Sequence, residues 1–354
     1  MIRSKKIFIH DYFENLGGGE KLILKIIEKN DILVTSFIKP EIKRFLKLNK
    51  IICMQKYSRN IFFNKFFLPI YFIFYNFEKK YRNCLVSGNY SIFTNLNKFK
   101  NKIFYCHSLP KLFFNFNKFY RNKSFIVKIF IFFIRKFFKY FYIKNLSKFD
   151  SIISNSKFTK KELDKVTKKK VKVVYPPIKS YLSKKIRKKK FFLSNSRHEI
   201  EKNIDIIIDV FNNCKNKELI ILSKGSQTKI LKKNVKNKNI KFLGIVDERK
   251  YKLLLNQCVA TINISSNEDF GMSAIEGMSA GKPAIVINEG GYLETCKNNF
   301  NSFILNKKNI KFNLLNLIKN FNYKKANQMK QNCIKTANYF SEKRFLKEVK
   351  SLFV

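Results

Sequence analysis

Short apolar runs alternate with segments of helical spacing along most of the chain. The first run is Ile7-Phe8-Ile9, and a loop containing Gly17-Gly18-Gly19 follows it. The next segment places apolar side chains from Leu22 to Ile27 on one helix face, and a further apolar run covers Ile32 to Phe37. This order of strand, glycine loop, helix and strand predicts a parallel sheet with helices on its faces.

The segment from residue 60 to residue 148 is less regular and is dense in Phe, Tyr and Lys. Within it, Ser124 to Tyr142 is predicted to be helical, and Lys128, Arg135 and Lys139 fall within about 40° of one another on its surface. Two interpretations stay open. The segment is either a core helix with one solvated basic stripe or a basic amphipathic surface that rests on a membrane.

The alternation becomes regular in the second half. A strand-to-helix unit covers Ser151 to Leu163, a strand from Val171 to Tyr175 ends at Pro176-Pro177, and the basic, polar segment from Pro176 to Lys190 is the predicted linker. Beyond it, strands are predicted at 191–193, 218–223, 240–244, 259–265 and 283–287, with helices at 203–211, 247–257 and 271–280. This pattern predicts a doubly wound sheet, whose ligands bind at the carboxyl ends of the strands.

The length of 354 residues favours two domains over one. We expect an N-terminal domain over residues 1–177 and a C-terminal domain over 178–335. Residues 324–354 are predicted to be wholly helical, and the helix at 336–354 is expected to pack back towards the N-terminal domain.

The chain is strongly basic, with a formal net charge of +49, yet this charge is spread over every segment. The excess of Lys accompanies an excess of Asn, Ile and Phe and a complete absence of Trp, which indicates a compositional bias of the whole chain. Part of the charge therefore needs no functional explanation. The remainder would still draw the protein to anionic membranes, at about 1 kcal/mol for each Lys or Arg close to the lipid.

Targeting and redox signals are weak. The seven cysteines are scattered and contain no C-x-x-C pair, so neither a disulfide framework nor a zinc site is predicted. The N-terminal apolar run is too short for the core of a signal peptide. The longest uncharged apolar stretch, Phe66 to Phe77, is about half the length needed to cross a bilayer, so no span is predicted.

The most informative stretch runs from Asn267 to Pro283 and holds two carboxylates, Glu268 and Glu276, eight residues apart. A helix that begins near Gly271 would aim its free N–H groups at the strand ends, which makes an anion site. Glu276, two turns into this helix, is in a position to accept hydrogen bonds from ribose hydroxyls. Taken alone, the two residues are equally compatible with a charged helix cap and a solvated helix residue.

The stretch resembles the E-x7-E signature of glycosyltransferase family 4, including the Phe-Gly after the first carboxylate and the Gly-x-Pro exit. Other landmarks that resemble this family follow in its order: Gly18-Gly19-Glu20-Lys21, Tyr105-Cys106-His107-Ser108, Ser154-Asn155-Ser156, Tyr175-Pro176-Pro177, Ser196-Arg197 with Lys202-Asn203, and Gly290-Gly291 with Glu294-Thr295. The resemblance implies an α/β chain of the GT-B fold, with two Rossmann-like doubly wound parallel-sheet domains that face a cleft.

The resemblance also implies a role for individual residues. Arg197 and Lys202 would hold the donor diphosphate, Glu276 the ribose and Glu268 hydroxyls of the transferred sugar, while His107 would face that sugar. The implied catalytic set is His107, Glu268, Arg197 and Lys202. The implied donor-binding set is Gly18, Gly19, Arg197, Lys202, Glu268, Phe270, Gly271, Met272, Ser273 and Glu276.

The activity implied by the family is transfer of a hexose from a nucleotide-diphosphate sugar with retention of configuration. No metal or other cofactor is expected, in agreement with the lack of any Asp-x-Asp. Mannose is favoured because His10-Asp11-Tyr12 and Tyr105-Cys106-His107-Ser108 resemble the mannosyltransferase branch. The expected acceptor is a glycan or lipid-linked glycan of cell-surface polysaccharide synthesis. The expected location is the cytoplasm, with peripheral contact to an anionic membrane.

Two alternative functions stay open. A polyanion- or nucleic-acid-binding protein would concentrate its charge on one face or arm, whereas Lys occurs here in every segment and no familiar nucleic-acid motif is present. Nucleic acid is therefore not an expected partner. A GT-B sugar-nucleotide epimerase is harder to separate by residues alone, and analysis of the products would distinguish it.

The sequence departs from the family pattern at two places. Gly277 follows the second carboxylate where the family more often has Ala, and this change is expected to loosen the helix by about 1 kcal/mol. The loop from Asn299 to Ile304 lacks the glycine that is usual before the next strand.

Overall fold

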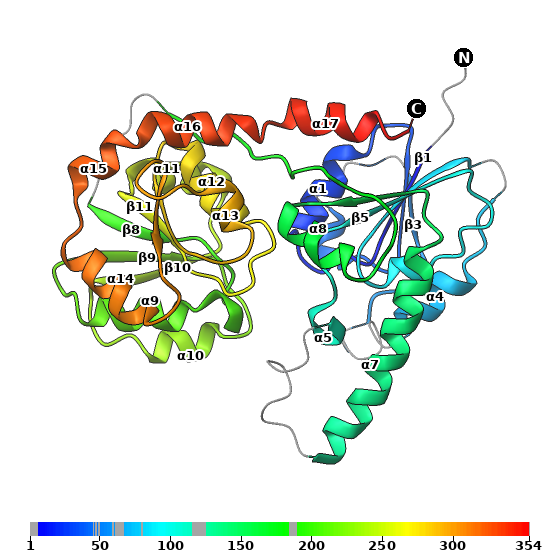
Figure 1. Cartoon of the computed structure of the whole chain (residues 1–354), viewed down its shortest axis with the longest axis horizontal. Helices are drawn as coiled ribbons and strands as arrows, with labels where there is room; N and C mark the ends of the chain where they lie inside the picture. The colour runs from blue at the N-terminus through cyan, green and yellow to red at the C-terminus, as the bar shows by residue number, and fades with distance from the viewer. Residues whose placement is uncertain are drawn as a thin grey trace. The chain divides into compact units, whose positions relative to one another are not determined.

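The computed structural model describes residues 6–353 apart from 45, 47, 49, 59, 61–66, 79–80, 115–124 and 184–189. The chain divides into two compact units, one made of Met1–Tyr175 with Leu346–Val354 and the other of Pro176–Phe345 (Figure 1). Each unit is a parallel sheet with helices packed on it. Part of the predicted linker, residues 184–189, lies outside the described residues.

The first unit contains a seven-stranded parallel sheet in the order β3-β2-β1-β4-β5-β6-β7. The strands predicted to begin near residues 7, 32, 151 and 171 are confirmed as β1, β2, β6 and β7. Strands β4 and β5 lie in the segment from residue 60 to residue 148, where the sequence showed no regular pattern. The strands are β1 (Lys6–His10), β2 (Ile32–Thr35), β3 (Ile51–Cys53), β4 (Asn83–Ser87), β5 (Asn101–Cys106), β6 (Ser151–Ser154) and β7 (Val171–Val173).

The helices of the first unit cover this sheet and surround one aromatic core. Phe104 in β5 contacts Phe149 and Tyr142, with ring centroids 5.1 and 6.5 Å away. Both partners are fully buried, so this core fixes the helix that precedes β6. The helices are α1 (Gly18–Ile26), α2 (Pro40–Lys43), α4 (Leu68–Phe74), the 3-10 turn η1 (Ser91–Phe93), α5 (Lys111–Phe114), α7 (Phe125–Leu146) and α8 (Lys157–Asp164).

The second unit contains a six-stranded parallel sheet in the order β10-β9-β8-β11-β12-β13. Strands β8, β11 and β12 are buried at every position, as expected for a parallel sheet covered on both faces. All five strands predicted in this half are confirmed. They are β8 (Phe191–Ser194), β9 (Glu218–Leu222), β10 (Ile240–Gly244), β11 (Ala260–Asn263) and β12 (Ala284–Ile287), and β13 (Ser302–Leu305) is added to them.

Helices cover both faces of the second sheet. Figure 1 shows α9, α10 and α14 on one face and α11, α12 and α16 on the other. Asp247 caps α11 by accepting a hydrogen bond from the Lys250 N–H at 2.8 Å. The helical elements are η2 (Ile200–Lys202), α9 (Ile204–Asn212), α10 (Thr228–Lys233), α11 (Glu248–Gln257), α12 (Met272–Ser279), α13 (Tyr292–Thr295), α14 (Ile310–Lys319), α15 (Tyr323–Gln328), α16 (Lys330–Tyr339) and α17 (Glu342–Lys350).

The prediction of a wholly helical tail is wrong, because the tail is three helices, α15 to α17, and ends in three non-helical residues. The main break follows α16. There the buried Phe340 ring packs against Phe270 at 5.3 Å, and the Phe340 carbonyl accepts a hydrogen bond from Ile178 N–H at 2.7 Å. The Phe340 carbonyl is therefore bonded to Ile178, whereas in a continuous helix it would accept from an N–H one turn further along.

The end of the chain belongs to the first unit. The Phe353 ring packs edge-on against Phe8 with centroids 6.0 Å apart, and the Leu352 carbonyl accepts a hydrogen bond from Asn101 Nδ2 at 3.1 Å. Lys350 adds an ion pair to Glu28 at 2.7 Å. The last residues are therefore anchored on a sheet whose first strand lies more than 300 positions earlier in the sequence.

Helix α12 packs on strand β11 through a glycine. A Cβ at Gly277 would lie 2.6 Å from both Cγ2 and Oγ1 of Thr261, which is closer than atoms in a folded protein approach. By helix propensity alone, Gly277 is only a weak point of the helix. The structure shows that its missing side chain lets the helix approach the strand.

We expect Gly277→Ala to lower the free energy of unfolding by about 1–3 kcal/mol because the added methyl group overpacks this contact. The loss should appear although Ala favours a helix by about 1 kcal/mol over Gly. Chemical denaturation followed by circular dichroism measures it. Adding Thr261→Ala should restore most of the stability, and two purely additive losses would contradict this explanation.

Candidate active site

The predicted donor residues gather where the strand order of the second sheet reverses. Strands β8 and β11 are neighbours, and the chain leaves them towards opposite edges of the sheet. In doubly wound sheets such a point opens a crevice at the carboxyl ends of the strands. Arg197 and Lys202 follow β8, and Glu268 follows β11, so two separate loops bring them to this point.

Lys202 and Glu268 form the ion pair at the centre of this site. Lys202 Nζ donates a hydrogen bond to Glu268 Oε2 at 2.8 Å, and the two side chains are only 16% and 19% exposed. Lys202 ends the 3-10 turn η2, and Asn203 after it adopts a left-handed conformation with φ of 53°. The Arg197 side chain lies in the same loop and is exposed.

Glu276 is held by a hydrogen-bond chain that the sequence analysis did not find. Tyr251 Oη in α11 donates to Glu276 Oε2 at 2.5 Å. Asn195 Nδ2, in the loop after β8, donates to Tyr251 Oη at 2.8 Å and to the Ser273 carbonyl at 3.1 Å. Asn263 Nδ2 at the end of β11 donates in turn to Asn195 Oδ1 at 2.9 Å.

Burial is the main cause that raises the pKa of Tyr251 well above its usual value, and the charge of Glu276 adds to it. Tyr251 therefore stays protonated and remains a hydrogen-bond donor to the carboxylate. Its partner lies 25 residues away in sequence, so no motif spacing could have revealed the pair. The neighbouring Ser196-Arg197 landmark was the available signal for Asn195.

Glycines shape the loop that carries Glu268. A Cβ at Gly290 would lie 2.4 Å from the Glu268 carbonyl oxygen, and one at Gly291 would lie 2.5 Å from the Asp269 carbonyl oxygen. The Gly291 N–H donates to the Glu268 carbonyl at 2.8 Å. Gly271 adopts φ of 85° as the N-cap of α12. These close approaches require glycine and fix the loop against the start of the helix.

The predicted donor residues at the start of α12 differ in their exposure. The Phe270 side chain is buried and packs against Phe340, so it serves the core and leaves only main-chain groups to face a ligand. Met272 and Ser273 are partly exposed in the first turn, where backbone N–H groups have no partner within the helix. This turn presents the positive end of the helix dipole.

The second unit can therefore bind an anion next to hydroxyl groups. Arg197, Lys202 and the start of α12 supply positive charge and N–H donors, as diphosphate binding requires. Glu268 and Glu276 supply acceptors for sugar and ribose hydroxyls. Among the residues that the structure describes, no group of three or more His, Cys, Asp or Glu side chains is placed to hold a metal ion.

His107 and Gly19 meet at the switch point of the first unit, where β1 and β4 are neighbours. A Cβ at Gly19 would lie 3.4 Å from the His107 ring, so the start of α1 lies directly beside the imidazole. Ser87 Oγ at the end of β4 hydrogen-bonds His107 Nε2 at 2.7 Å. Gly18 is exposed at the same helix start.

Asp11, part of the His10-Asp11-Tyr12 motif, positions a loop near His107. Its carboxylate accepts hydrogen bonds from the N–H groups of Asn89, Tyr90 and Ser91 at 2.7, 3.0 and 2.7 Å. Gly88 has φ of 131°, and a Cβ there would collide with the carboxylate at 2.2 Å. Asp11 thus ties the end of β1 to the loop after β4.

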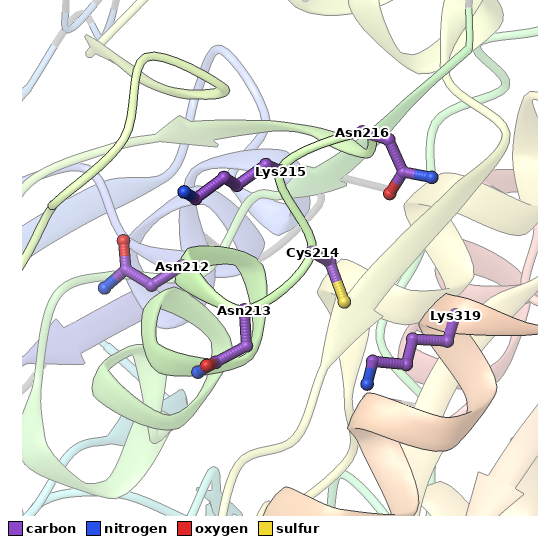
Figure 2. A pocket seen from close by; sticks show the side chains of 6 residues that line it. All are labelled: Asn212, Asn213, Cys214, Lys215, Asn216 and Lys319. Atoms are coloured by element: carbon purple, nitrogen blue, oxygen red, sulfur yellow. The ribbon is translucent and has the colours of Figure 1, made fainter.

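The sheet of the second unit also has a hollow at its other end. Figure 2 shows this hollow, of about 650 Å³, lined by Asn212, Asn213, Cys214, Lys215, Asn216 and Lys319. It lies between the ends of α9 and α14 and ahead of β9, so it is not at the carboxyl ends of the strands. Asn212 is engaged with Asn234 and Lys236. None of the predicted site residues lines this hollow.

Burial, with a smaller effect of His10, lowers the pKa of His107 to about 3. The unfolded chain, with an ordinary His pKa near 6.5, therefore binds a proton between these values that the folded chain excludes. We expect the free energy of unfolding to fall as the pH drops below about 6.5, with His107 contributing up to about 1.4 kcal/mol per pH unit. The stability of His107→Gln should show a correspondingly smaller pH slope between 6.5 and 4 in denaturation experiments. Parallel slopes for the two proteins would contradict the depressed pKa.

Residues 182–336 match the family model described as "Glycosyl transferases group 1". Among curated proteins, the chain is 34% identical over 148 residues to the Alpha-1,3/1,6-mannosyltransferase ALG2 of Dictyostelium discoideum, covering 34% of this chain and 35% of the relative. It is 27% identical over 195 residues to the uncharacterized glycosyltransferase MJ1178 of Methanocaldococcus jannaschii, covering 53% and 55%. The chain thus spans from about a third to about half of the length of these relatives.

Solved structures resemble the chain over nearly its whole length. HepE of Anabaena, in complex with UDP and glucose, has a TM-score of 0.76 at 15% identity and 99% coverage of both chains. Sucrose-phosphate synthase of Thermosynechococcus elongatus has a TM-score of 0.73 at 14% identity, covering 99% of this chain and 98% of that one. The chain therefore has the GT-B fold, and its residues 182–336 form a domain similar to the glycosyl transferases of group 1.

Proposed function

We propose that the chain is a retaining glycosyltransferase of family 4 that transfers a hexose from a nucleotide-diphosphate sugar to a glycan or lipid-linked glycan. One observation carries the proposal. The Lys202–Glu268 ion pair lies at the switch point of a domain similar to the glycosyl transferases of group 1, with Arg197 in the same loop as Lys202 and with Glu276 held by Tyr251. Mannose is the proposed sugar, in keeping with the name of the Dictyostelium relative.

In this proposal, Arg197, Lys202 and the start of α12 hold the diphosphate. Negative charge grows on the diphosphate as the glycosidic bond breaks, so preorganised cations stabilise the transition state more than the bound donor. Glu276, oriented by Tyr251, accepts hydrogen bonds from the ribose. The Lys202–Glu268 contact holds the Glu268 carboxylate in place for the hydroxyls of the transferred sugar.

In this proposal the first unit binds the acceptor and also contributes groups that face the donor. His107, with Gly18 and Gly19 at the start of α1, serves the transfer as a neutral imidazole, because its depressed pKa excludes a proton at neutral pH. It can therefore accept or donate one hydrogen bond without adding charge. The proposed site is cytoplasmic, with its acceptor presented at the membrane periphery in cell-surface polysaccharide synthesis.

The proposed chemistry is a same-face displacement without a metal or other cofactor. The acceptor oxygen forms the new glycosidic bond as the bond to the diphosphate breaks, and the departing phosphate takes the acceptor proton. Nuclear magnetic resonance of the product should show the donor's anomeric configuration. A glycosyl group trapped covalently on Glu268 would contradict this mechanism.

The donor site predicts the outcome of calorimetric titration with GDP, UDP and ADP. We expect one nucleotide to bind, and we expect Arg197→Ala and Glu276→Ala each to weaken its binding by about 1.5 to 3 kcal/mol through loss of a hydrogen-bonded charged group. Lys319→Ala is the matched control, because it removes a cation from the hollow at the other end of the sheet. Binding that depends on Lys319 and not on Arg197 would move the nucleotide site to that hollow.

The hydrogen bond from Tyr251 predicts a selective effect on ribose recognition. Tyr251→Phe should reduce the preference for the ribonucleotide over its 2′,3′-dideoxy analogue by about three- to tenfold, because Glu276 loses its fixed orientation. Tyr181→Phe is the control, since its ring packs on Tyr251 at 5.3 Å. Equal weakening of both nucleotides would instead indicate a general loss of structure.

A further inference from the structure

Helix α7 of the first unit packs one apolar face on that unit, and further apolar side chains among its described residues are exposed. On its inner face, Phe138 stacks on Phe113 with centroids 3.7 Å apart and contacts Phe93 at 5.2 Å, while Tyr142 contacts Phe114 at 5.4 Å. These contacts hold the C-terminal half of the helix on the unit. In Figure 1 the N-terminal half of α7 projects away from that unit's sheet.

Several other apolar side chains of α7 face solvent. Phe133, Phe137 and Tyr140 are 64%, 68% and 60% exposed and lie within about 60° of one another around the helix. Ile129, Phe132 and Ile134 are exposed as well. A single exposed apolar residue is ordinary, but six within twelve positions of one helix form a surface that marks an interaction site.

The charge of this helix favours an anionic occupant. Helix α7 carries five Lys or Arg residues and no Asp or Glu. Lys136 and Lys144 are exposed on the same side as Phe133 and Tyr140, so cations and aromatic rings share one face. Long basic side chains bury their stems beside apolar groups and extend their charge to the polar layer. Bulky apolar groups interleaved with cations are the pattern of helices that lie in a lipid interface.

Two other occupants fit less well. A second copy of this chain would bring like charges together, because both helices carry the same five cations. A protein partner would need an acidic surface with its own apolar pockets. A lipid surface matches both features at once, and α4, which packs on η1 as α7 does, adds the exposed and uncharged Phe74 and Ile70 to this unit.

We propose that α7 docks the first unit on an anionic lipid surface. The helix lies in the headgroup layer, with Phe133, Phe137 and Tyr140 towards the acyl chains and Lys136 and Lys144 beside the lipid phosphates. Among the described helices, none is both long and apolar enough to cross a membrane, and the proposed contact is a surface contact. It does not depend on which sugar or acceptor the site uses.

The absence of Trp in this chain gives a direct test, because one introduced Trp becomes the sole indole reporter. With Phe137→Trp, vesicles of phosphatidylcholine and phosphatidylglycerol should shift the emission to the blue and protect it from acrylamide. Phe312→Trp, at a 62% exposed position on α14 of the second unit, should change little. No shift at Phe137→Trp, or an equal shift at both positions, would overturn the proposal.

Co-sedimentation of the full chain separates the apolar and the charged contribution. Phe133→Ser with Phe137→Ser, and Lys136→Gln with Lys144→Gln, should each weaken binding to the anionic vesicles about tenfold or more. The matched control for charge is Lys232→Gln with Lys233→Gln on α10, both exposed, which should have little effect. Equal losses in the control and the α7 pair would mean that only total charge matters and would overturn the assignment to α7.

The oligomeric state of the same proteins, measured by size-exclusion chromatography, tests whether a second copy of the chain covers α7. If α7 contacts lipid, the unmodified chain and Phe133→Ser with Phe137→Ser should have the same oligomeric state without vesicles. A dimer that is lost with this double substitution would assign the surface to a second copy and overturn the lipid contact. Nucleotide binding should be unchanged in the α7 variants, since the proposed donor residues lie in the other unit.

Discussion

A parallel sheet covered on both faces can keep charged side chains only beyond the ends of its strands, and this constraint places the chemistry of the chain. In the second unit, β8 and β11 are buried throughout and contain no charged residue, and the charged residues follow the last strand positions. Asn195, Arg197 and Lys202 come after one strand, and Glu268 after the other. Because these strands are neighbours whose connections diverge, their loops meet over one crevice. The Lys202–Glu268 pair forms there, with both side chains largely sheltered from water.

The high Asn content of the chain is visible at the backbone positions with positive φ. Four of the five described non-glycine residues with positive φ are asparagines: Asn203, Asn267, Asn299 and Asn309. Asparagine tolerates the left-handed region better than most residues, which explains how the loop at Asn299 manages without the usual glycine. Glycine is kept where a Cβ would collide, as at Gly271, Gly277, Gly290 and Gly291. Asn therefore occupies positions that require only a positive φ. Gly occupies positions where a Cβ would collide with a neighbouring atom.

Preorganisation explains the polar network around Glu276. Asn263, Asn195 and Tyr251 come from a strand, a loop and a helix, and each fixes the next through a hydrogen bond. A carboxylate held in this way pays less conformational entropy when it binds a hydroxyl group than a free one would. In the first unit, Asp11 holds the loop after β4 in a similar way, and Ser87 at the end of β4 hydrogen-bonds His107, which follows β5.

Local patterns of the sequence suffice to predict the alternation of the second half, because buried parallel strands and their loops repeat along the chain. The motifs also suffice to propose Arg197, Lys202, Glu268 and Glu276 as donor residues. The sequence also determined the helical nature of the segment that became α7. Only the tertiary structure decided that Phe270 belongs to the core, that Tyr251 reaches Glu276, that Gly277 faces Thr261 and that α7 exposes Phe133 and Phe137. These facts depend on which elements lie side by side, and side-chain contacts between distant segments leave no spacing that a single sequence could show.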